Sequence, residues 1–161
     1  MRKVFILLFL IIFFGCKKDI LPKPKAYLSL TYPEKTYEDL KLSRPYSFKV
    51  SKMATLINEK NNWLSIKYPK LKASIDITYR PLKNNIRELL TEAEKLVFKH
   101  TAKADRIIPQ DFINKEKRVF GSIYEITGNA ASQIQFHVTD STNNFIKGSL
   151  YFYAKPNYDS I

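Results

Sequence analysis

Residues 63–100 read WLSIKYPKLKASIDITYRPLKNNIRELLTEAEKLVFKH and contain both kinds of element that decide the fold. In the first half, the runs 63–68 and 71–79 alternate apolar and polar side chains. This alternation is typical of strands that have one solvent-facing side. Pro69-Lys70 separates the two runs and favours a tight turn. We therefore expect an antiparallel hairpin.

The second half of this stretch predicts one amphipathic helix. Asn85, with Glu88 three residues later, is a capping-box pattern, and Pro81 marks the end of the preceding strand. At 3.6 residues per turn, the apolar side chains that follow share one face. They are Ile86, Leu89, Leu90, Ala93, Leu96 and Val97, with His100 at the end of the stripe.

Further strands are expected on both sides of this central stretch. Short runs at 27–32 and 46–50 precede it, and runs at 119–127, 133–138 and 148–154 follow it. In the run 133–138 we expect the apolar side chains Ile134, Phe136 and Val138 to point inward, with His137 on the polar side. The order of strands, helix and strands predicts an α+β fold, an antiparallel β-sheet with one main amphipathic helix packed on a face.

The first sixteen residues predict export and lipidation. Arg2 and Lys3 precede an apolar run at 4–14, which is too short to span a bilayer but typical of a signal peptide. Gly15-Cys16 then forms a lipobox, in which the cysteine receives diacylglyceryl and an acyl chain such as palmitate. The alternative is an ordinary signal peptide with a chance cysteine, but Cys16 is the only cysteine in the chain, and an exported lone thiol has no disulfide partner.

These features divide the chain into three parts. We expect a lipoprotein signal peptide at 1–15, a lipidated, basic and proline-bearing tether at 16–26, and a single α+β domain at 27–161. Several acyl chains on Cys16 would hold the protein durably on a membrane.

The chain is strongly basic. Its net charge is +12, or +10 once Arg2 and Lys3 leave with the signal peptide. Such a surface suits an anionic partner, namely lipid headgroups, a cell-wall polymer or an acidic protein face, although it also fits a merely solubilising surface. Nucleic acid is not expected, because an exported lipoprotein rarely meets it.

Motifs for catalysis or metal binding are missing from the sequence. His137, Asp140 and Ser141 are the residue types of a catalytic triad, but they straddle a predicted strand end and no nucleophile elbow accompanies them. His100 is expected to pack on the helix and to interact with its dipole. We find no zinc or calcium motif, and four glycines leave little material for nucleotide-binding loops. The sequence predicts a binding protein without catalytic, metal or cofactor residues, not an enzyme.

One segment stands out between two predicted strands. Asn129, Ala130, Ala131, Ser132 and Gln133 are mostly small and would let a ligand or another backbone come close. The two interpretations are a simple hairpin turn and an interaction loop.

The chain resembles the gliding motility lipoprotein GldD family over essentially the whole exported part. The resemblance rests on several blocks: LPKPKAY at 21–27, YP at 32–33, PYSF at 45–48, Trp63 with YPK at 68–70, NAASQ at 129–133, TDS at 139–141 and GSLYFYAKPNYDS at 148–160. It implies a non-enzymatic cell-envelope lipoprotein required for gliding and associated with the gliding and type IX secretion machinery. It also implies a further helical segment after the last block, whereas this sequence stops at Ile161, so truncation of the C-terminus is left open.

The resemblance also bears on location. Surface-displayed lipoproteins of the bacteria that carry this family tend to have acidic residues after the lipid cysteine, whereas Lys17 and Lys18 follow Cys16 here. We therefore expect a domain that faces the periplasm, anchored through Cys16 to the inner or the outer membrane, with other gliding and secretion envelope proteins as partners. The alternative function is a periplasmic ligand-binding or cell-wall-binding module.

Overall fold

The computed structural model describes residues 34–153, apart from the side chains of His100 and Thr101. The predicted signal peptide, Cys16, the tether and the strand expected at 27–32 lie outside these residues, as does the predicted packing of the His100 side chain.

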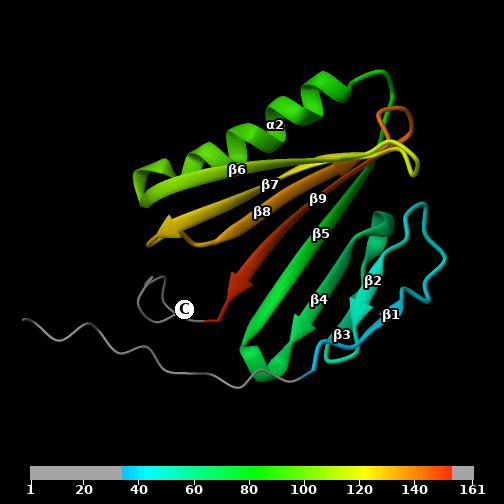
Figure 1. Ribbon diagram of the computed structural model, residues 1–161, viewed down its shortest axis with the longest axis horizontal. Helices are drawn as coiled ribbons and strands as arrows, with labels where there is room; N and C mark the ends of the chain where they lie inside the picture. The colour runs from blue at the N-terminus through cyan, green and yellow to red at the C-terminus, as the bar shows by residue number, and fades with distance from the viewer. Residues whose placement is uncertain (1–33, 154–161) are drawn as a thin grey trace, which may run out of the picture. The chain divides into compact units, whose positions relative to one another are not determined.

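The described chain forms two antiparallel sheets and one α-helix (Figure 1). A small sheet pairs β1 (Tyr37–Asp39) with β2 (Lys49–Ser51). The large sheet has seven strands in the order β3-β4-β5-β9-β8-β7-β6. Its strands are β3 (Thr55–Asn58), β4 (Leu64–Tyr68), β5 (Ala73–Pro81), β6 (Ala104–Asn114), β7 (Val119–Gly128), β8 (Ile134–Thr139) and β9 (Asn144–Phe152). The helix α2 (Ile86–Phe98) follows β5, and short 3-10 helices occur at Lys60–Asn62, Pro69–Leu71 and Lys99–Ala102. The predicted α+β class is confirmed.

The central hairpin forms as predicted. β4 and β5 pair with Leu64 opposite Ile77 and Ile66 opposite Ile75, so their apolar side chains share one face. Pro69–Leu71 makes the connection as a single 3-10 turn, and Lys72 ends that turn in the left-handed conformation.

The two faces of the large sheet are covered by different elements. On one face, here called the helix face, α2 packs over β8 and β9 and buries Phe145 with Leu89 and Ala93 (Figure 1). On the opposite face, here called the hairpin face, Leu40 and Val50 from the segment around β1 and β2 pack on residues of β4 and β5. The members of this second cluster that are fully buried are Leu40, Val50, Leu64, Ile66 and Ile77.

The helix starts at the predicted place, but its capping box does not form. Asn85 occupies the N-cap position, yet its side chain makes no cap hydrogen bond. Its Oδ1 instead accepts a hydrogen bond from the backbone N–H of Lys83 at 2.9 Å. The buried stripe is also narrower than predicted, because only Leu89, Ala93 and Val97 are fully buried. This spacing of four residues places the three side chains on one side of the helix, toward the sheet.

The predicted orientation of the strand at 133–138 is wrong. Gln135, His137 and Thr139 lie on the helix face and are at most 7% exposed, whereas Ile134, Phe136 and Val138 lie on the hairpin face and are only half-buried. The polar side of β8 is the better covered one because α2 lies on it. Its apolar side is left partly open, and that opening contains the candidate site.

Candidate binding site

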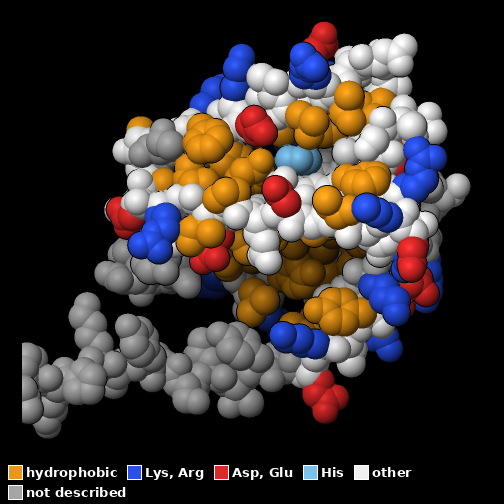
Figure 2. All heavy atoms as spheres, turned by 45° about the horizontal axis from the view of Figure 1, so that its top comes forward, with side chains coloured by type: hydrophobic (Ala, Val, Ile, Leu, Met, Phe, Trp, Pro, Cys, Tyr) orange, Lys and Arg blue, Asp and Glu red, His pale blue; other side chains and the backbone are white. Residues whose placement is uncertain are grey.

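An apolar cavity of about 630 Å³ lies on the hairpin face, between the segment 45–51 and the strands β4, β5, β8 and β9. Figure 2 shows a hollow with hydrophobic walls, with Lys and Arg side chains beside it. The volume falls within the range of about 300–1,000 Å³ that is usual for small-molecule sites. Most of the lining side chains are apolar, and they include Tyr46, Phe48, Ile66, Ile75, Ile77, Phe112, Phe136, Val138 and Ile146.

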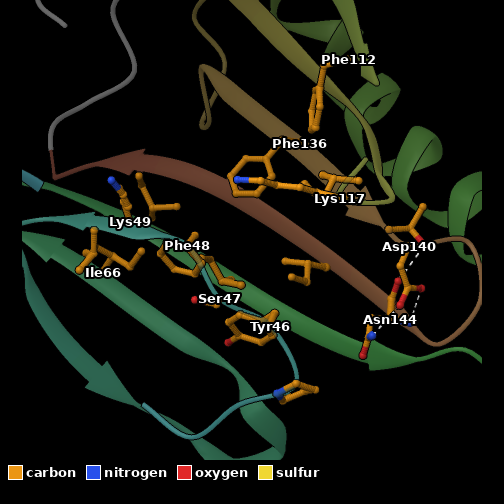
Figure 3. A pocket seen from close by; sticks show the side chains of 18 of the residues that line it. Tyr46, Ser47, Phe48, Lys49, Ile66, Phe112, Lys117, Phe136, Asp140 and Asn144 are labelled. Atoms are coloured by element: carbon orange, nitrogen blue, oxygen red, sulfur yellow. Dashed lines mark hydrogen bonds between the residues drawn. The ribbon is translucent and has the colours of Figure 1, made fainter. Parts of the chain in front are cut away.

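The aromatic floor of the cavity depends on two glycines. A Cβ atom at Gly148 would collide with the ring of Phe136, and one at Gly121 would collide with the ring of Phe112 and the carbonyl oxygen of His137. Each glycine therefore leaves space for a ring to lie flat on a neighbouring strand. The two rings widen the apolar surface on the side where no described element covers the sheet, and Phe112 is 38% exposed (Figure 3).

The opposite wall is the segment that leads into β2. The Tyr46 and Phe48 rings stack with 6.1 Å between their centroids, and the Tyr46 ring also contacts Tyr79 on β5 at 5.8 Å. The Tyr46 hydroxyl donates a hydrogen bond to the carbonyl oxygen of Asn62 at 2.6 Å, which ties this wall to the start of β4. Burial raises the pKa of Tyr46, although the Arg44 guanidinium beside it opposes that shift, so the hydroxyl stays a donor at neutral pH.

Cations border the cavity. Lys49 comes from β2 and Lys117 from the turn between β6 and β7 (Figure 3). Arg118 follows in the same turn, and all three residues are exposed. Arg118 adopts the left-handed conformation (φ 51°), which is unusual for a residue with a side chain. Its guanidinium donates a hydrogen bond to Thr142 Oγ1 at 3.3 Å and so links this turn to the turn between β8 and β9.

Asp140 is the one carboxylate among the lining residues, and both of its oxygens accept hydrogen bonds from its own turn. Oδ1 accepts hydrogen bonds from the backbone N–H groups of Thr142, Asn143 and Asn144 at 2.8–2.9 Å, and Oδ2 accepts one from the Asn144 side chain at 2.7 Å. Burial favours the protonated carboxyl, but these donors outweigh it and hold the pKa of Asp140 well below its usual range. The turn is thus built around a permanent negative charge.

His137 does not join a catalytic triad in this structure. Its ring is 5% exposed and lies under α2, stacked on Phe145 at 5.8 Å and tilted against Tyr124 at 6.1 Å. Within residues 34–153, its Nδ1 has no hydrogen-bond partner. Burial lowers the pKa of His137, while Glu94 and Asp111 act in the opposite direction, so the ring is neutral at pH 7.

The segment Asn129–Gln133 is folded tightly against the protein. Ala130 and Ser132 are at most 1% exposed, and Ala130 packs in a cluster with Val97 of α2. The Gln133 side chain donates to the Ala130 carbonyl at 2.8 Å, and Ser132 Oγ donates to the Ile134 carbonyl at 3.0 Å. Asn129 and Ala131 remain exposed. The small side chains are therefore needed for packing, and a role as an interaction loop stays a prediction that rests on the two exposed residues.

Two kinds of feature are absent from the described residues. In the range 34–153, no group of three or more His, Cys, Asp or Glu side chains is arranged to hold a metal ion. Within the same range, no helix has the length and apolar character needed to cross a membrane.

The structure therefore defines an α+β domain whose antiparallel sheet is covered by a helix on one face and has an apolar cavity on the other. A family model described as gliding motility lipoprotein GldD matches residues 17–161, which is every residue after Cys16. The chain belongs to the gliding motility lipoprotein GldD family. No curated protein and no solved structure matches it.

Proposed function

We propose that this protein is a non-enzymatic component of the cell envelope that acts beside the gliding and type IX secretion machinery, anchored to a membrane through lipid on Cys16. The observation that carries the proposal is the family match, which begins at Lys17 and runs through the whole exported chain. A lipobox cysteine directly before the matched region supports lipidation at that position. Several acyl chains on one residue are enough for durable anchoring.

The domain is proposed to face the periplasm. Lys17 and Lys18 follow the lipidated cysteine, and each cation close to an anionic leaflet contributes about 1 kcal/mol of attraction. Protease added to intact cells is expected to leave the protein uncut, and to digest it once the outer membrane is permeabilised. Digestion on intact cells would show that the domain is displayed on the surface instead.

Deletion of the gene tests the role in motility. The deletion strain is expected to lose surface spreading. It is also expected to lose export of the gliding adhesins, the surface proteins that the type IX secretion system exports, and the wild-type gene should restore both. A Cys16→Ala copy should restore them poorly at equal protein level, because its product lacks the lipid anchor. A deletion strain that spreads normally would refute the proposal.

A second candidate function is supported by the basic surface. The exported chain carries a net charge of +10, and an anionic cell-wall polymer is a chemically suitable partner. Sedimentation with purified peptidoglycan at low and high salt separates the two functions. Electrostatic binding should weaken sharply as added salt shortens the screening length. Retention that does not change with salt would argue against this candidate.

A further inference from the structure

We propose that the cavity on the hairpin face binds a single-chain amphiphile, with its alkyl chain between the sheet and the segment 45–51 and its anionic head against Lys117, Arg118 and Lys49. This ligand site deepens the ligand-binding alternative and does not depend on the motility role. Three properties of the cavity support it: its apolar walls, the state of its polar groups, and the charge at its border.

The walls suit a flexible hydrocarbon chain. They combine aliphatic side chains of β4, β5 and β9 with the rings of Phe48 and Phe136, which face the cavity from different elements (Figure 3). When a hydrocarbon chain covers apolar surface, each Å² removed from water contributes about 25 cal/mol to the free energy of binding. An alkyl chain adapts to such a shape because each of its bonds has several low-energy rotamers.

Two polar side chains that line the cavity, Asn144 and Tyr46, are already hydrogen-bonded to the protein. Asn144 Oδ1 accepts from the Tyr79 hydroxyl at 2.9 Å, and its amide nitrogen donates to Asp140. The Tyr46 hydroxyl donates to the Asn62 carbonyl at 2.6 Å. A peptide would bring backbone N–H and C=O groups that need partners inside the cavity, at a cost of about 1–3 kcal/mol for each one left unpaired. An alkyl chain brings none.

The charge at the border selects the head group. Lys49, Lys117 and Arg118 line the cavity, and no acidic side chain forms an ion pair with any of them within residues 34–153. The one carboxylate among the lining residues, on Asp140, accepts four hydrogen bonds from its own turn. A carboxylate or phosphate would therefore meet unpaired cations, whereas a cationic head would be repelled. The two sources of this chemistry are a free fatty acid and a lysophospholipid.

The test uses the exported chain from position 16 onward, with Cys16→Ser so that its own lipid cannot fill the cavity. A fluorescent fatty acid is bound first, and displacement is then measured with palmitate, lysophosphatidylglycerol, lysophosphatidylcholine and the uncharged hexadecanol. Palmitate, lysophosphatidylglycerol or both should displace the probe at concentrations about tenfold lower than hexadecanol, because only an anion pairs with the border cations. Stronger displacement by palmitate identifies a fatty acid, and stronger displacement by lysophosphatidylglycerol identifies a phospholipid.

Matched variants locate the site. Lys117→Glu should weaken probe binding roughly tenfold, while Lys115→Glu, with the same charge change in the same turn but outside the cavity lining, should change it less than about twofold. Val138→Trp, which places a large ring in the cavity, should abolish binding, whereas Ile108→Trp on the edge strand should not. Thermal melting shows whether each variant is folded. If Val138→Trp is unfolded, the proposal is tested by Lys117→Glu, which changes an exposed position.

Several results would overturn the proposal. The first is that none of the four compounds displaces the probe. The second is that hexadecanol and palmitate displace the probe equally well and Lys117→Glu binds the probe as tightly as the wild type does. Preferential capture of an extended peptide at the cavity would also overturn it, because the occupant would then not be an amphiphile.

Discussion

Replacement of Asp140 is expected to unfold the end of the sheet that borders the cavity. In Asp140→Ala, the backbone N–H groups of Thr142, Asn143 and Asn144 lose their acceptor, and so does the Asn144 side chain. Hydrogen bonds to a charged acceptor contribute about 1.5–3 kcal/mol each when both groups are shielded from water. Thr142 and Asn143 are exposed, so water replaces the acceptor there, and the full loss falls mainly on the half-buried Asn144.

From this geometry, the free energy of unfolding of Asp140→Ala should fall by about 2–3 kcal/mol. Asp140→Asn keeps an oxygen acceptor without the charge and should lose about 1 kcal/mol. In a domain of this size the larger loss lowers the melting temperature by roughly 10 °C. Circular dichroism during heating measures it, and Glu116→Ala, at an exposed carboxylate in the neighbouring turn, is the control. An Asp140→Ala melting temperature equal to that of the control would refute the reasoning.

The same charge predicts a dependence on pH. Because the pKa of Asp140 is lower in the folded protein than in the unfolded chain, its contribution is fully present above the ordinary Asp pKa of about 3.9. It is lost as the pH falls further, through the folded-state pKa. Acid unfolding of Asp140→Asn should therefore depend less on pH below about pH 4 than that of the wild type. Parallel curves for the two proteins would contradict this.

Three further predictions concern the packing of the two faces. Leu89→Ala should destabilise the protein by about 3 kcal/mol and speed amide exchange in α2, because it leaves a cavity under the helix, and unchanged exchange would contradict it. His137→Phe should make the free energy of unfolding depend less on pH near pH 6. The pKa of His137 is lowered in the folded protein, so the wild type loses stability as the pH falls below the ordinary His pKa of about 6.5. Denaturant midpoints measured over a range of pH test this, and an unchanged dependence in the variant would count against it. Gly148→Ala should cost about 1–3 kcal/mol in a denaturant titration, because its Cβ displaces the Phe136 ring, and a neutral result would show that this ring moves freely.

The elements with strong periodicity were predictable from the sequence. The β4–β5 hairpin and α2 appear at the predicted positions, because alternation over nine residues and a four-residue apolar stripe are both local signals. β6 was missed, although it is the longest strand described. Its two sides mix apolar and polar residues, with Ile107, Pro109 and Asp111 on one side, and it is mostly exposed. An edge strand of this kind is stabilised by pairing with β7, which no local pattern reveals.

The candidate site was not predictable for a related reason. The alternation of the polar residues Gln135 and His137 predicted that their side of the strand faces solvent. In the folded protein α2 covers that side, and Phe136 on the other side faces the cavity. The local pattern of β8 does not reveal which of its sides the helix covers, because α2 precedes β8 by two strands in the chain. The glycine at 148 was a usable signal, since a glycine inside a strand often marks the close approach of another group.

Surface spreading of a deletion strain tests most directly whether this lipoprotein supports gliding. The deletion strain is compared with strains that express the wild-type protein or Cys16→Ala at equal protein level. The deletion strain should not spread, the wild-type protein should restore spreading, and Cys16→Ala should restore it poorly. Normal spreading of the deletion strain would contradict the account.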